Sequence, residues 1–216
     1  MRFALLACLL ACPAAAAPRT PLTPACEPAI AAAEQRAQTA PGLLAAIGLV
    51  ESGRGDPRTG QRRPWPWTVT AEGVGTYYES KADAIAAVEA LQARGVASVD
   101  VGCMQVNLMY HPAAFRSLDE AFDPGPNAAY AARFLQSLYA KLTDWPEAAA
   151  AYHSFSPVPN AQYAKLIAAV WSGAPVPVTR RPDGIEVVTF PGGGEMRIFR
   201  SVAPAGGQGR PVFVLN

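Results

Sequence analysis

The stretch LLAAIGLVESG at residues 43–53 is apolar apart from Glu51 and Ser52 near its end. Leu44, Ile47 and Glu51 recur at the spacing that places side chains on one face of a helix, and Gly53 is a helix stop. We therefore expect a helix over residues 43–52 with Glu51 on its inward face. Lost solvation and the negative end of the helix dipole would both raise the pKa of this carboxyl, as a general acid requires. The simpler alternative is a helix-end glutamate turned toward solvent.

Helical patterns flank this segment on both sides. An Ala-rich segment at residues 30–39 precedes it and ends before Pro41-Gly42, a helix-breaking pair. Apolar spacing and helix-start signals predict further helices at residues 80–95, 127–143, 145–153 and 163–173. The expected fold class is therefore mostly α, a domain of about six helices over residues 26–172.

Two segments read as strands rather than helices. Residues 65–78 predict a small β-hairpin insert with aromatic side chains on both arms. The Pro/Gly-rich C-terminal tail, residues 173–216, contains a second candidate β-hairpin between residues 185 and 199. A lone hairpin is marginal in water, so the tail must dock on the domain, bind a partner or stay loose.

The composition excludes some classes of protein. The 216-residue chain has 18 Lys and Arg against 17 Asp and Glu, a formal charge of +1. Phosphate binding normally needs a strongly basic face, so we expect no nucleic-acid partner. Apolar residues make up 50% of the chain and charged residues 16%, which permits a sizeable core and argues against wholesale disorder.

The N-terminus has the pattern of a secretory signal peptide. Arg2 precedes an apolar run at residues 3–12 and a small-residue segment at residues 13–18. We expect a signal peptide at residues 1–17 and a linker at residues 18–25, with a buried first helix or a lipobox ending at Cys12 as alternatives. Because no other apolar run approaches the length of a membrane span, we expect no membrane span and a periplasmic location.

Removal of the signal peptide leaves two cysteines, Cys26 and Cys103. In an oxidising compartment they can pair as a disulfide, and two buried thiols are the alternative. His111 and His153 could complete a zinc site on paper, but the spacing of the four residues matches no ligand pattern, so we expect no metal.

Four short motifs occur in a fixed order along the chain. They are Glu51-Ser52-Gly53, the segment GCMQVN at residues 102–107, Asn127 before an apolar helix, and Ala151-Tyr152-His153. Together they resemble the lysozyme-like lytic transglycosylase family of the soluble murein type. The resemblance covers about residues 26–172 and implies an exported enzyme that binds and cleaves peptidoglycan glycan strands.

The resemblance also implies roles for individual residues. Glu51 would be the catalytic acid and then the base. Substrate-binding or supporting positions would be Ser52, Met104, Gln105, Asn107, Tyr152 and His153. Of these, Met104 and Gln105 would line the sugar subsites, and Tyr152 would hydrogen-bond near Glu51. His153-Ser154 departs from the family's Asn-Ala at this position. The hairpin insert at residues 65–78 replaces the short link that usually joins the catalytic helix to the glycine motif. Chains with these features resemble the branch associated with flagellar and secretion machinery, so the C-terminal tail is a candidate binding segment for such a partner.

The motifs supply one carboxyl, whereas a hydrolytic glycosidase usually uses two. Asp56 and Asp100 lie near the motifs in sequence, but neither belongs to one. The expected reaction is therefore non-hydrolytic, with a 1,6-anhydro product and no cofactor. Two alternatives remain: a hydrolytic muramidase on the same fold, and a catalytically dead glycan-binding or assembly protein, which His153 and the long tail favour.

Overall fold

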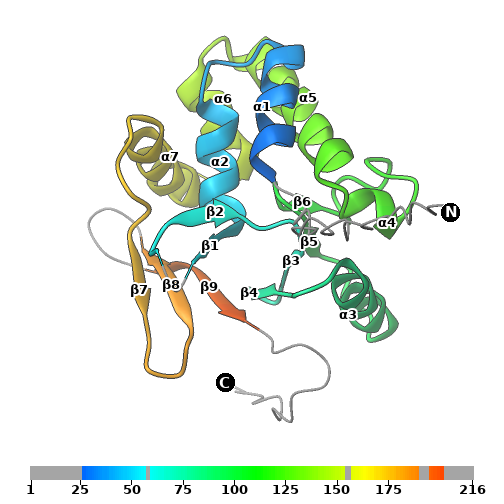
Figure 1. Ribbon diagram of the computed structural model, residues 1–216. Coiled ribbons are helices and arrows are strands. Elements are labelled where there is room, and N and C mark those ends of the chain that lie inside the picture. The colour runs from blue at the N-terminus through cyan, green and yellow to red at the C-terminus, as the bar shows by residue number, and fades with distance from the viewer. Residues whose placement is uncertain (1–25, 57–58, 154–156, 190–194, 202–216) are drawn as a thin grey trace, which may run out of the picture.

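The computed structural model describes residues 26–56, 59–153, 157–189 and 195–201 (Figure 1). The signal peptide and linker expected at residues 1–25 lie outside these residues, as does the end of the tail at residues 202–216. Within the described residues the chain forms seven helices: α1 (Cys26–Ala37), α2 (Leu43–Ser52), α3 (Lys81–Ala93), α4 (Leu118–Ala121), α5 (Pro124–Leu142), α6 (Trp145–His153) and α7 (Pro157–Trp171). The mostly α fold is confirmed.

Helix α2 begins and ends where its sequence pattern predicts. Leu43, Leu44 and Ile47 are completely buried. Gly53 follows directly and donates its backbone N–H to the carbonyl of Leu49. Helices α1 and α7 pack against α2, and Figure 1 shows α2 among α1, α5, α6 and α7 on one side of the molecule. The helix is apolar on nearly all sides because it lies in the interior.

The strands form two sheets. A small sheet pairs β1 (Gly53–Gly55) with β2 (Arg62–Pro64) in antiparallel register. The larger sheet has the order β6-β5-β3-β4-β9-β8-β7. Its strands are β3 (Thr68–Ala71), β4 (Val74–Tyr77), β5 (Val99–Val101), β6 (Val106–Asn107), β7 (Val178–Arg180), β8 (Glu186–Thr189) and β9 (Glu195–Ser201). The predicted insert hairpin, β3–β4, therefore lies inside a larger sheet.

The C-terminal tail docks on the domain through this sheet. Strands β8 and β9 pair in antiparallel fashion, and β9 pairs in parallel with β4, so that Gly75 is opposite Phe199. The buried ring of Phe199 stacks on Tyr77 with 5.1 Å between the ring centroids. A Cβ on Gly75 would lie only 2.3 Å from the Phe199 ring, so glycine makes room for the contact. Of the three outcomes that the sequence left open for the hairpin, the structure has the docked one.

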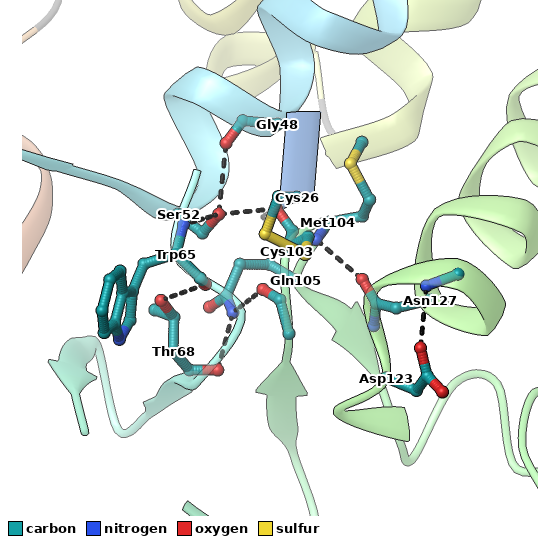
Figure 2. Close-up of a disulfide and its surroundings, with 12 residues drawn as sticks. Cys26, Gly48, Ser52, Trp65, Thr68, Cys103, Met104, Gln105, Asp123 and Asn127 are labelled. Carbon is teal, nitrogen blue, oxygen red and sulfur yellow. Dashed lines mark hydrogen bonds between the residues drawn. A yellow bond between two sulfur atoms is a disulfide. The ribbon is translucent and has the colours of Figure 1, made fainter. Parts of the chain in front are cut away.

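A disulfide between Cys26 and Cys103 joins the first residue of α1 to the turn that follows β5 (Figure 2). Both cysteines are completely buried. The bond closes a loop with a sequence separation of 77 residues. A cross-link over so long a loop is expected to stabilise the fold by about 4 kcal/mol, because it restricts the unfolded chain.

None of the helices described by the structure has the length and apolar character needed to cross a membrane.

Candidate active site

A cavity of about 560 Å³ lies beside the C-terminal end of α2. Glu51 forms one wall, and the other walls come from the segment after β5 and from helices α5 and α6. Many of the side chains around it are aromatic, as is typical of sites that bind sugar rings by stacking. The lining residues are Glu51, Asp100, Gln105, Val106, Asn107, Tyr110, His111, Tyr130, Phe134, Ala151, Tyr152 and His153.

Glu51 faces inward, as the helical spacing predicts, and is only 1% exposed. The hydroxyl of Tyr163, on α7, donates a hydrogen bond of 2.7 Å to Oε1 of Glu51. The ring of His153 stacks on Tyr163, with centroids 4.6 Å apart and planes 12° from parallel. Helices α2, α6 and α7 thus hold this carboxyl in one position next to the cavity.

The turn at residues 102–105 forms the neighbouring wall and is held by Asn127 of α5. The Asn127 side-chain oxygen accepts from the N–H of Met104 at 2.8 Å (Figure 2), and its amide nitrogen donates to the carbonyls of Val101 and Ala121. Gly102 has a φ of +82°, and a Cβ there would lie 2.4 Å from the Asn127 amide. The glycine is therefore required both by the backbone conformation and by the close approach of Asn127.

Gln105 lines the cavity with its amide group fixed from three sides. Its Nε2 donates to the carbonyls of Thr68 and Gly102, and its Oε1 accepts from the Thr70 hydroxyl (Figure 2 shows the bond to Thr68). The residue is nearly buried and has a φ of +48°. A non-glycine residue in the left-handed region carries backbone strain, which is common where a side chain must be aimed at a site.

Two of the expected substrate-binding residues, Met104 and Ser52, are buried in the core and do not line the cavity. Met104 is completely buried and does not line the cavity; its sulfur packs against α2 at Gly48, where an added Cβ would lie 3.1 Å away. Ser52 is also completely buried, and its hydroxyl donates to the carbonyl of Cys103 at 2.6 Å (Figure 2). Contrary to the expectation for Met104, neither side chain lines the cavity; both join α2 to the 102–105 turn, which for Ser52 is a supporting position.

The remaining expected residues do line the cavity. The Tyr152 hydroxyl donates to the carbonyl of Met104 at 2.8 Å. Asn107 donates to Asp100 at 2.8 Å, and its side-chain oxygen accepts from the N–H groups of Met109 and Tyr110. The structure thus brings Gln105, Asn107, Tyr152 and His153 together with Glu51 around one space.

Several cavity residues lie outside the sequence motifs. Asp100 adds a second carboxyl to the lining. His111 shares a 2.9 Å hydrogen bond with the Tyr130 hydroxyl; partial burial lowers the pKa of His111, although the nearby Asp100 opposes this effect. Tyr110 is 72% exposed at the cavity's edge. Since an exposed aromatic beside a sugar-sized cavity offers a stacking surface, it is a candidate binding residue.

Tyr163 is the most important residue that the sequence analysis did not identify as functional. Its spacing with Leu166, Ile167 and Val170 predicts a core stripe, and the structure does bury it completely. A buried tyrosine usually needs a hydrogen-bond partner for its hydroxyl, and this need was the sequence feature that could have pointed to a polar contact at Tyr163. The partner, Glu51, is 112 residues away in the sequence, so spacing alone could not name it.

Helix α2, which lies among α1, α5, α6 and α7 (Figure 1) and carries an inward glutamate beside an open cavity, is the core of a lysozyme-like helical domain. The family model of the transglycosylase SLT domain matches residues 28–156, more than half of the chain. The chain therefore belongs to the SLT transglycosylase family, whose substrate is peptidoglycan. The comparisons with curated proteins and with solved structures gave no match.

Proposed function

We propose that the protein is an exported peptidoglycan lytic transglycosylase that cleaves the β-1,4 bond between N-acetylmuramic acid and N-acetylglucosamine without water. The observation that carries this proposal is the carboxyl of Glu51, buried at the end of α2 and hydrogen-bonded by Tyr163 beside an aromatic-lined cavity. Such a carboxyl is desolvated and held in one orientation, as a general acid must be.

In this mechanism Glu51 acts twice. It first gives its proton to the glycosidic oxygen, so that the C1–O bond breaks and the N-acetylglucosamine part leaves with a free hydroxyl. The 2-acetamido group of the muramic residue shields C1. Glu51, now a carboxylate, takes the proton of the C6 hydroxyl as O6 bonds to C1 and closes the 1,6-anhydro ring. The acid is regenerated and no cofactor takes part; such acid–base catalysis is typically worth about 10²- to 10⁴-fold.

The other residues of the cavity would bind and orient the glycan. Gln105 and Asn107 present fixed polar groups, and Tyr152 and His153 contribute ring faces on the side of α6. Met104 and Ser52 support the site from behind rather than contacting the sugar.

One observation favours a second candidate, a hydrolytic muramidase on the same fold. Asp100 lines the same cavity as Glu51, and Asn107 holds its carboxylate. Glycoside hydrolases usually use two carboxyl groups that face one cavity, the second of which activates water or attacks the sugar.

Digestion of purified sacculi followed by mass spectrometry tests both candidates. Lytic cleavage gives anhydro-muramic ends, whereas hydrolysis gives reducing ends that are heavier by one water. We expect anhydro ends from the wild type and from Asp100→Asn, and release lowered by about 10²- to 10⁴-fold in Glu51→Gln. Reducing ends that disappear in Asp100→Asn would favour the muramidase. If folded wild-type protein releases nothing, the glycan-binding or assembly alternative is supported instead.

Export to the periplasm is supported by the signal-peptide pattern and by the Cys26–Cys103 disulfide, since disulfides persist in oxidising compartments. N-terminal sequencing of the mature protein tests it, with cleavage after Ala16 or Ala17 as the expected result. We further propose that the enzyme opens the wall locally for a flagellar or secretion apparatus. Crosslinking from the exposed Thr179 to components of such an apparatus tests this role, and the absence of any crosslink would count against it.

A further inference from the structure

The chain leaves helix α2 at Gly53, two residues after Glu51, and the carbonyl of Gly53 is held by two side chains. The guanidinium of Arg62, on β2, donates to this carbonyl, as does the buried hydroxyl of Tyr77 at 2.5 Å. The backbone N–H of Trp65 also donates to the carbonyl of Ser52 at 3.0 Å. The last turn of α2, which carries Glu51, is therefore fixed from outside the helix.

The C-terminal tail supplies the negative charge that holds Arg62 in place. Oε2 of Glu186, the first residue of β8, accepts from Arg62 at 2.6 Å, and its Oε1 accepts from Arg180 at 2.5 Å. Burial alone would raise the pKa of Glu186, but the hydrogen bonds from Arg180 and Arg62 outweigh it and hold the pKa below its usual value. Glu186 is therefore a carboxylate at neutral pH.

The pair is nearly removed from solvent. The Arg62 side chain is 13% exposed and that of Glu186 is 7% exposed. A buried guanidinium without its counter-charge must move toward water, because an unpaired buried charge is costly. Loss of Glu186 would therefore withdraw Arg62 from the Gly53 carbonyl. Glu186 also packs closely against β1, since a Cβ on Gly55 would lie 3.3 Å from Oε1 of Glu186.

We propose that Glu186 is a positioning residue for Glu51, acting through Arg62 and the Gly53 carbonyl. The docked tail hairpin then belongs to the catalytic unit, although it lies outside residues 28–156, the range that the family model matches. This inference deepens the proposed function and rests on it. Positioning matters because a displacement of about 1 Å in a catalytic group can cost about 100-fold in rate.

The test compares three variants in muropeptide release. Glu186→Gln keeps the size of the side chain but removes its charge. Val187→Ala, at a buried position next to Glu186 on β8 where strand alternation places the side chain on the opposite face, serves as the matched control for loosening the hairpin. The double variant Arg62→Leu/Glu186→Leu removes both buried charges and leaves only Arg180, whose side chain is 55% exposed to water, without its partner, so it is expected to fold. We expect kcat to fall about 10- to 100-fold in Glu186→Gln and in the double variant, with KM changed less than about twofold and Val187→Ala near wild type.

A crystal structure of Glu186→Gln supplies a readout that does not depend on activity. We expect the bond between Tyr163 and Glu51, 2.7 Å in the wild type, to be broken or lengthened in Glu186→Gln and kept in Val187→Ala. A double variant with wild-type kcat, or an unchanged Glu51 in the Glu186→Gln crystal, overturns the proposal. If the wild type itself lacks lytic activity, the proposed function fails, whereas the crystal comparison still decides whether Glu186 positions Glu51.

Discussion

Replacing Tyr163 by phenylalanine removes one buried hydroxyl behind the wall of the proposed active site and little else. The ring is completely buried, and phenylalanine fills the same space against His153. What is lost is the 2.7 Å hydrogen bond to Oε1 of Glu51. Once Glu51 has given up its proton, this bond joins a hydroxyl to a charged carboxylate, and such bonds are worth about 1.5–3 kcal/mol. Since about 1.4 kcal/mol corresponds to a tenfold change in rate, we expect kcat to fall about 10- to 100-fold.

The assay is the initial rate of anhydro-muropeptide release from sacculi, followed by chromatography and mass spectrometry. Tyr139→Phe is the matched control, because that tyrosine stacks on Trp145 away from the cavity. Its rate should equal that of the wild type. A folded Tyr163→Phe protein with wild-type kcat would refute the reasoning, since Glu51 would then be held in place by other contacts.

Four further predictions follow from individual contacts. Glu51→Gln should lower lytic activity by about 10²- to 10⁴-fold with an unchanged circular dichroism spectrum, and activity near wild type would remove Glu51 as the catalytic acid. Tyr110→Ala should raise KM for glycan strands by about tenfold, the loss of one stacking contact, whereas Tyr110→Phe should leave it unchanged. Gly75→Ala should lower the melting temperature, because its Cβ would meet the Phe199 ring; an unchanged melting curve would mean that β9 does not dock as described. Glu186 has a lowered pKa in the folded protein, so its stabilisation is present above its unfolded pKa near 4.5 and is lost as pH falls below that value; urea titrations from pH 7 to 3 should show a steeper loss of stability in the wild type than in Glu186→Gln.

Local patterns predicted the helices well because the relevant contacts are close in sequence. Residues 43–52 form α2 as expected, and the Ser80 hydroxyl accepts from the N–H of Asp83 as a cap of α3. The inward direction of Glu51 follows from the same periodicity. The expected helix at residues 30–39 begins earlier, at Cys26, and ends at Ala37.

The contacts that complete the site could not be predicted in the same way, because they join segments far apart in the chain. The Tyr163–Glu51 hydrogen bond spans 112 residues, and the Arg62–Glu186 pair spans 124. The family resemblance implied that Met104 lines the cavity, but Met104 and Gln105 are adjacent in the turn and their side chains face different ways. Gln105 lines the cavity, whereas Met104 packs into the core.

The parallel pairing of β9 with β4 has a practical consequence for work with shortened forms of the gene. The family match ends at residue 156, and composition alone suggests an end near residue 172. A protein that stopped at either point would leave the N–H and C=O groups along one side of β4 without their strand partner. Open strand edges recruit other chains, so we expect such a protein to self-associate. Its low activity could then be attributed to the loss of a binding partner, although the cause would be the missing strand β9 beside β4.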